Sequence, residues 1–182
     1  MEIEIVKEVC RRYAGCSKDY HVDPIPDRKA EGARQGLELA AGEEIAALVD
    51  FTLMGGASNA FVVMGSGICW KNNEDNTPRR LTWAQLRGKT PTLKKGIITH
   101  EIDFGAGVKM SLAGAYFEGD KISQLTALLC DLQKLDPLVL SNSPEIPRTN
   151  GSGQGYVTCE FCSGLVKPDV TYCKHCGIKL KG

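Results

Sequence analysis

The sequence lacks an excess of charge of either sign. Its 182 residues include 22 Lys and Arg and 22 Asp and Glu, so the formal net charge is zero. This balance excludes a strongly basic nucleic-acid coat and a dominant acidic tail. Aromatic residues make up only 7% of the chain, which argues against a surface built of many rings for stacking on bases.

Long apolar runs are also missing. None approaches the roughly 20 residues that span a bilayer. The first residues, Met1 to Glu4, carry two acids ahead of a short apolar segment, which is not the pattern of a secretory signal. We therefore expect a cytoplasmic protein without a transmembrane segment, long enough for one ordinary domain and a small appendage.

Catalytic motifs are missing as well. The sequence contains no GxSxG, no Walker A motif and no HExxH. Among the histidines, His100 stands beside Glu101 and Asp103. On a strand, however, His100 and Glu101 point to opposite faces and do not pair directly. The sequence therefore predicts a protein that is not an enzyme.

Cysteine is plentiful and unevenly placed. Four of the eight cysteines are scattered, at Cys10, Cys16, Cys69 and Cys130. The other four form two CxxC pairs separated by ten residues, Cys159 with Cys162 and Cys173 with Cys176. Disulfides are not expected in the cytosol, and two CxxC pairs at this spacing indicate a tetrahedral site for structural Zn²⁺. Iron in a rubredoxin-like site is the alternative, because it uses the same four ligands.

The cysteine-rich segment is too short to fold on an apolar core, so a bound metal must supply its folding energy. Four thiolates close the coordination sphere and leave no position for water or substrate. Small residues follow each second cysteine, and residues 156–181 resemble the zinc-ribbon family. Residues 137–155 are rich in Pro, Ser and Gly and predict a flexible linker, which leaves 156–182 as the ribbon.

The first 43 residues predict an N-terminal helical segment. Apolar residues recur at helical spacing from Ile3 to Tyr13, and Pro26 is placed to open a second short helix. From residue 44 the period changes. Apolar runs at 45–52, 61–64 and 68–71 are spaced as an antiparallel meander.

The second half of this central domain, which we expect to span 44–136, continues the pattern. Further strands are predicted at 81–83, 97–104 and 108–112. An amphipathic helix follows, capped by Asp120 and ending near Leu135. Trp70 and Trp83 fall in predicted strands and are expected in the core. The order of elements predicts an α+β fold in which the final helix covers the sheet.

Residues 25–135 resemble the bacterial PH-like domains of the YokE-like and GRAM–PH superfamily. The resemblance is carried by residues 25–29, 44–52, 55–64, 67–71, 81–83 and 120–135. It implies an antiparallel β-barrel or sandwich capped by a C-terminal amphipathic helix. Lipid-reading members grip inositol phosphates with basic residues in the first hairpin. The matching residues here, 54–59, include no Lys or Arg, so phosphoinositide binding is not expected.

A separate basic stretch contains no acid. Between residues 76 and 100 it holds Arg79, Arg80, Arg87, Lys89, Lys94 and Lys95. If these side chains converge on one face, they form an anion-binding site for phosphates. The alternative is a set of solvated charges that protect loops and strand edges.

Three hypotheses for function follow. The first is a non-catalytic binding or adaptor protein, whose PH-like domain presents a sheet edge or rim to a protein partner and whose zinc ribbon adds a second contact. The alternative is a nucleic-acid or anionic-membrane binder that uses residues 79–95 and the ribbon, with an affinity that falls steeply with salt. A homo-oligomer in which the N-terminal helix pairs or swaps is the third.

Overall fold

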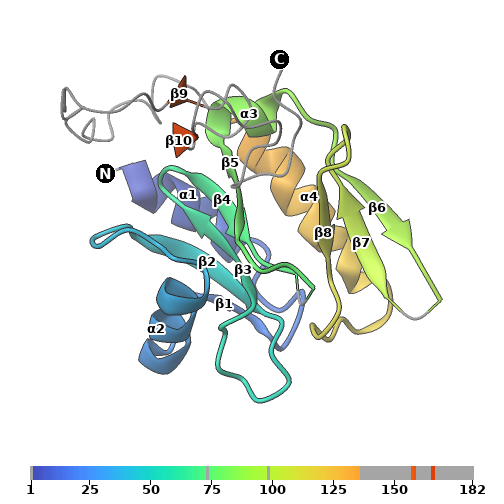
Figure 1. Cartoon of the computed structure of the whole chain (residues 1–182). Coiled ribbons are helices and arrows are strands. Elements are labelled where there is room, and N and C mark those ends of the chain that lie inside the picture. Colours follow the sequence, from blue (N-terminus) through green and yellow to red (C-terminus); the bar gives the residue numbers. More distant parts are fainter. Residues whose placement is uncertain (1, 73, 98, 136–156, 159–164, 167–182) are drawn as a thin grey trace.

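The computed structural model describes residues 2–72, 74–97, 99–135, 157–158 and 165–166 (Figure 1). Its helices are α1 (Glu2–Arg11), α2 (Asp27–Gly36), α3 (Trp83–Arg87) and α4 (Ile122–Gln133), with a 3₁₀ turn, η1 (Gly119–Lys121), ahead of α4. Its strands are β1 (Tyr20–Val22), β2 (Ile45–Asp50), β3 (Ala60–Met64), β4 (Gly67–Trp70), β5 (Arg79–Thr82), β6 (Thr92–Lys95), β7 (His100–Asp103), β8 (Lys109–Ser111), β9 (Val157–Thr158) and β10 (Leu165–Val166).

The first five strands form one antiparallel sheet in the order β1-β2-β3-β4-β5. In its centre Leu48 lies opposite His21 on one side and Val62 on the other. Gly67 closes the tight β3–β4 turn with a φ of 149°, and a side chain there would clash with the Leu81 carbonyl of β5. Strands β6, β7 and β8 form a second antiparallel sheet, with Ile102 between Leu93 and Met110.

Both faces of the five-stranded sheet are covered, which explains why β2, β3 and β4 are buried at every position. Ala47 and Val49 belong to the larger core, which they share with α1, α4 and the second sheet. Leu48 and Val62 face the smaller core under α2. Strands buried on both faces read as continuous apolar runs instead of alternating ones.

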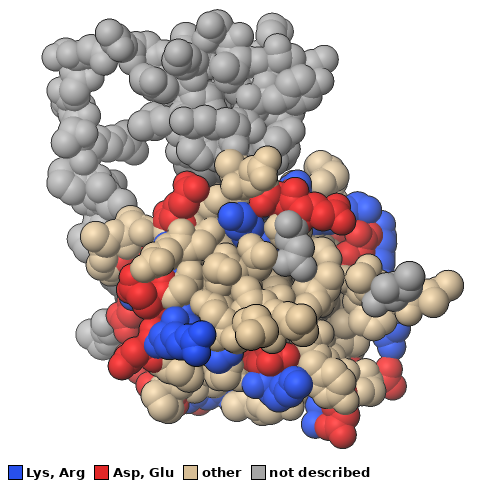
Figure 2. Space-filling model, turned by 60° about the horizontal axis from the view of Figure 1, so that its bottom comes forward, with Lys and Arg blue, Asp and Glu red and all other residues tan. Residues whose placement is uncertain are grey.

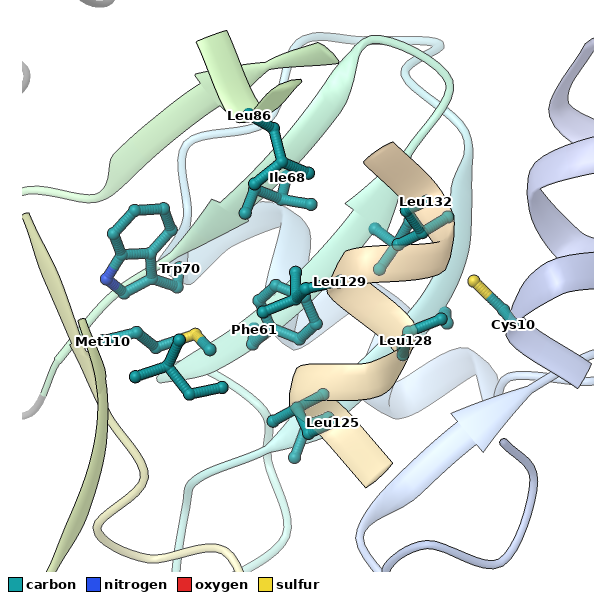
Figure 3. Close-up of a cluster of buried hydrophobic side chains, with 14 of the residues drawn as sticks. Cys10, Phe61, Ile68, Trp70, Leu86, Met110, Leu125, Leu128, Leu129 and Leu132 are labelled. Carbon is teal, nitrogen blue, oxygen red and sulfur yellow. The ribbon is translucent and has the colours of Figure 1, made fainter. Parts of the chain in front are cut away.

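Helix α4 supplies the centre of the larger core. Leu125, Leu128, Leu129 and Leu132 are fully buried in one stripe; in Figure 3, Leu129 lies at Phe61 of the five-stranded sheet and Leu128 points toward Cys10 of α1. Trp70 of β4 stacks on Phe104 of the second sheet with ring centroids 5.2 Å apart. These contacts join the two sheets through side chains.

The predicted α+β class, with antiparallel sheets, is confirmed. Trp70 and Trp83 are buried as expected, and their indole nitrogens donate to the Lys109 and Gly65 carbonyls, 3.1 and 2.6 Å away. The expected barrel is not closed within the described residues, because the two sheets share no strand pairing. In Figure 1, α4 lies between them.

Two local expectations needed correction, and one strand was missed. Asp120 does not cap α4, because η1 precedes the helix and the Asp120 carboxylate accepts instead from Lys95 at 2.7 Å. The segment 1–43 is not only helical, since β1 pairs with β2. Strand β6 was not anticipated from its polar sequence.

No helix in the described part of the chain is long and apolar enough to cross a membrane.

Candidate interaction surface

The four cysteines predicted to bind zinc, Cys159, Cys162, Cys173 and Cys176, lie outside the described residues, so the zinc site stays a prediction. The described strands nearest to them are β9 and β10, which pair antiparallel. In the sequence the first CxxC pair stands in the connection between these two strands. Elsewhere in the described part of the chain, no group of three His, Cys, Asp or Glu residues is placed to hold a metal.

The six basic residues predicted to bind anions are distributed over both sheets. Arg79 and Arg80 lie on β5, Arg87 and Lys89 on or just after α3, and Lys94 and Lys95 on β6. Four of the six form ion pairs: Arg79 with Asp75, Arg80 with Glu43, Lys94 with Asp103 and Lys95 with Asp120. Arg80 also donates to the Leu37 and Glu38 carbonyls beyond the end of α2. Most of the positive charge in this stretch is therefore compensated by acids from other elements.

The connection between β2 and β3, residues 51–59, begins at a buried ion pair that the sequence did not predict. Asp50 is only 1% exposed, and its Oδ2 accepts from Lys29 Nζ of α2 at 2.5 Å. Its Oδ1 accepts from the backbone N–H and the hydroxyl of Thr52, at 2.8 and 2.5 Å. Burial raises the pKa of Asp50, but the hydrogen bonds from Lys29 and Thr52 outweigh burial and hold that pKa below its usual range. The carboxylate thus fixes the first turn of the loop.

The rest of the loop lies directly against α2. Gly32 and Gly36 stand one turn apart on the helix, and a Cβ on either would overlap a loop carbonyl, that of Gly56 or that of Ser58. The missing side chains let backbone pack on backbone. The Thr52 hydroxyl also accepts from the Ala57 N–H at 3.0 Å. Helix α2 and Asp50 together hold the loop in one conformation.

The loop exposes two large apolar side chains. Leu53 is 95% exposed and Met54 is 85% exposed. The connection between β8 and η1 lies alongside, because Gly114 contacts the Phe51 backbone so closely that it has no room for a side chain. That connection presents Tyr116, which is also exposed, with Lys18 Nζ 4.9 Å from the centre of its ring. We call Lys18, Leu53, Met54 and Tyr116 the loop surface.

Uncharged residues dominate the end of the molecule that carries these loops. Figure 2 turns this end forward: tan residues fill the middle of the face, and Lys, Arg, Asp and Glu gather mainly around them. Depletion of charged residues at the centre of a surface is one of the features of protein–protein interfaces. A single exposed apolar side chain is ordinary on a protein surface, whereas two adjacent and almost fully exposed ones on an anchored loop are not.

The titratable groups near the loop are already engaged or lack a reacting partner. The Lys29 ammonium is held by Asp50. His21 has its Nε2 buried without a hydrogen-bond partner among the described residues, and its pKa is lowered by burial and by the nearby charge of Lys29.

Comparison of the chain with protein-family models, with curated proteins and with solved structures finds no match. Any function assigned to the chain therefore rests on its own residues.

Sequence reasoning missed the loop surface, although two signals point to it. An acid, Asp50, ends an otherwise apolar strand and is followed by Thr52, a pattern that favours a side-chain-capped turn. Two glycines four residues apart, Gly32 and Gly36, stand on a short helix, a spacing that lets another backbone approach closely. Neither signal identifies its partner, because Asp50 meets Lys29 and the two glycines meet Gly56 and Ser58, all far away in the sequence.

Proposed function

We propose that this chain is a non-catalytic adaptor protein that binds a protein partner through the loop surface. The observation that carries the proposal is the nearly complete exposure of Leu53 and Met54 on a loop that Asp50 and α2 hold in place. Full burial of one such side chain is worth about 1.5–3 kcal/mol. A loop already fixed before binding loses little conformational entropy when a partner covers it.

The order of elements supports a PH-like domain as the scaffold. A four-stranded meander, β2 to β5, is followed by a three-stranded meander, β6 to β8, and then by α4. This is the order that the resemblance of residues 25–135 implies. In such a scaffold Leu53 and Met54 belong to the first hairpin, which here offers apolar side chains where lipid-reading members carry basic ones.

The zinc ribbon is proposed as a second contact. Cys159, Cys162, Cys173 and Cys176 would hold structural Zn²⁺ in a cytoplasmic protein, where thiols stay reduced. Linked to the PH-like domain by residues 137–155, the ribbon would raise the effective concentration of whichever contact binds second.

The anionic-partner alternative has less support. It needs free positive charge between residues 79 and 95, and four of the six cations there are paired with acids. Binding to nucleic acid or to an anionic membrane through these residues would fall steeply with salt. Binding through the loop surface would depend on salt only weakly.

The test compares two surface variants of the full chain. The partner is first captured on the wild-type protein, purified and titrated by calorimetry. We expect the double variant Leu53→Ser/Met54→Ser to weaken binding about 100-fold, equivalent to roughly 2.7 kcal/mol. The control is Ile97→Ser, which removes an equally exposed apolar side chain from the β6–β7 connection. A double variant that binds like wild type, or a control that loses the partner instead, would refute the proposal.

A further inference from the structure

Helix α1 carries an exposed stripe on the side opposite the core. Val6, Val9 and Cys10 are buried in the larger core. The exposed stripe consists of Ile5, Glu8, Arg12 and Gly15. The helical course continues past Arg11 through turns in which the N–H groups of residues 12 to 14 donate three residues back. Ile5, Glu8 and Arg12 therefore follow one line along the surface, at spacings of three and four, and Gly15, with a φ of 89°, ends the last turn beyond them.

The stripe borders a groove of about 670 Å³ between α1 and the C-terminal end of α4. Ile5, Val9 and Leu135 provide its apolar lining, and charged side chains stand around them. The Tyr13 hydroxyl donates to Asp131 Oδ2 at 2.6 Å and ties α1 to α4 at this groove. We call this feature the α1–α4 groove.

The charges along the stripe are available to a partner. Arg12 is exposed, and its guanidinium has no ion pair or hydrogen bond within the described residues, although its charge contributes to the lowered pKa of Asp131 across the groove. Glu8 has a 60% exposed side chain and one distant contact, with Arg11 at 3.4 Å. Above Gly15 there is open space, since nothing lies within 4 Å of the position that a Cβ would occupy.

From Ile5 to Gly15 the stripe is apolar, acidic, basic and small. When a second copy of the stripe runs in the opposite direction, acid faces base and the apolar side chain faces the small residue. We infer that the occupant of the α1–α4 groove is a second copy of this chain, with the two α1 helices packed antiparallel about a two-fold axis. In this register Glu8 of each copy faces Arg12 of the other, and Ile5 of each lies over Gly15 of the other. Both pairings place the axis at the level of Cys10, so a single two-fold satisfies all four contacts. This is an isologous interface.

The dimer is expected to be weak, with a modest dependence on salt. Exposed ion pairs each contribute little and are screened by salt, so the apolar lining of the groove supplies most of the affinity. The paired charges set orientation and register. This contact is separate from the loop surface and does not depend on the proposed function.

Charge reversal provides the test, read by sedimentation velocity over a concentration series of the full chain. The wild type shifts with concentration from 19.7 kDa towards twice that mass. Glu8→Arg and Arg12→Glu each place like charges face to face, and each weakens association at least 10-fold. An equimolar mixture of the two single variants restores wild-type association, because every facing pair is again opposite in charge. The double variant E8R/R12E also associates by itself.

The controls separate this interface from loss of folding. Arg28→Glu reverses another exposed charge, on α2, and leaves association unchanged. Thermal melting by circular dichroism confirms that each variant is folded. A wild type that stays monomeric up to several hundred micromolar, or two single variants that do not associate when mixed, would overturn the inference. An equal loss of association in the Arg28→Glu control would also overturn the inference. If another protein or later residues of the same chain occupy the α1–α4 groove, the wild type stays monomeric at these concentrations.

Discussion

On one face of the five-stranded sheet, α1 and α4 bury a large apolar core, whereas on the other face α2 presents two glycines and a lysine to the β2–β3 loop. The first face is stabilised by the burial of large apolar side chains, since Trp70, Phe61 and the leucines of α4 are all fully buried. The second has a smaller apolar cluster and depends also on close backbone contact and on the Lys29–Asp50 ion pair. The comparison shows how the domain separates its tasks: one face supplies stability, and the other positions an exposed loop.

The largest effect is expected from a cavity on the α4 side. Leu129→Ala should lower the free energy of unfolding by about 2–5 kcal/mol, because the removed methyl groups leave a space that the surrounding core fills only in part. The fold of the loop surface is unaffected, so partner affinity per folded molecule stays at the wild-type value. Urea unfolding measures the first quantity and calorimetric titration the second. Loss of affinity as large as the loss of stability would show that the two faces are not separate.

A smaller effect is expected from the ion pair on the α2 side. Asp50→Asn should lower the free energy of unfolding by about 2 kcal/mol, because hydrogen bonds to a charged group contribute about 1.5–3 kcal/mol. Lys29 is 19% exposed and reaches water after the change, which limits the loss. Here affinity for the partner should fall as well, because the carboxylate fixes the first turn of the loop.

The pH dependence gives this prediction a second readout. The folded-state pKa of Asp50 lies below its ordinary value of 3.8. The stabilisation by Asp50 is therefore present above pH 3.8 and is lost as the pH falls through the lower, folded-state value. The stability difference between wild type and Asp50→Asn should be constant from pH 5 to 7 and should shrink below about pH 4. A difference that persists unchanged at pH 2.5 would contradict the role assigned to the charge.

A change in stability of similar size is expected from a methyl group on α2. Gly36→Ala places a Cβ against the Ser58 carbonyl, and overpacking of this kind costs about 1–3 kcal/mol. The matched control is Gly88→Ala at the end of α3, where φ is −79° and the nearest atom is 3.6 Å away. The control should stay within about 0.5 kcal/mol of wild type. Equal effects of the two substitutions on thermal unfolding would refute the close contact between helix and loop.

Local patterns in the sequence predicted much of this fold. The apolar period of α1 and α4 and the apolar runs of β2, β3 and β4 identified the elements that bury most of the core. Strands β1 and β6 were missed for a physical reason. Each is short and lies at the edge of a sheet, and β6 carries the polar sequence Thr-Leu-Lys-Lys, which protects an unpaired edge.

The site could be predicted only in part, because its partners are distant in the sequence. Asp50 and Lys29 are 21 residues apart, and Arg80 meets Glu43 across 37 residues. A stretch that reads as an uncompensated basic patch is therefore largely neutralised by the fold. The exposure of Leu53 also depends on how Gly32 and Gly36 pin the loop, which no local pattern specifies. The four cysteines predicted to bind zinc are the opposite case, because their spacing is local and predicts a metal site directly.

Methionine methyl NMR tests the central claim most directly. The chain has four methionines; Met54 is exposed on the loop surface, and Met64 and Met110 are buried in the two cores and serve as internal references. With ¹³C-methyl-labelled methionine, saturating amounts of the captured partner should shift and broaden the Met54 signal and leave those of Met64 and Met110 in place. A bound complex in which the Met54 signal keeps its free position and width would contradict the account, since the partner would then lie elsewhere.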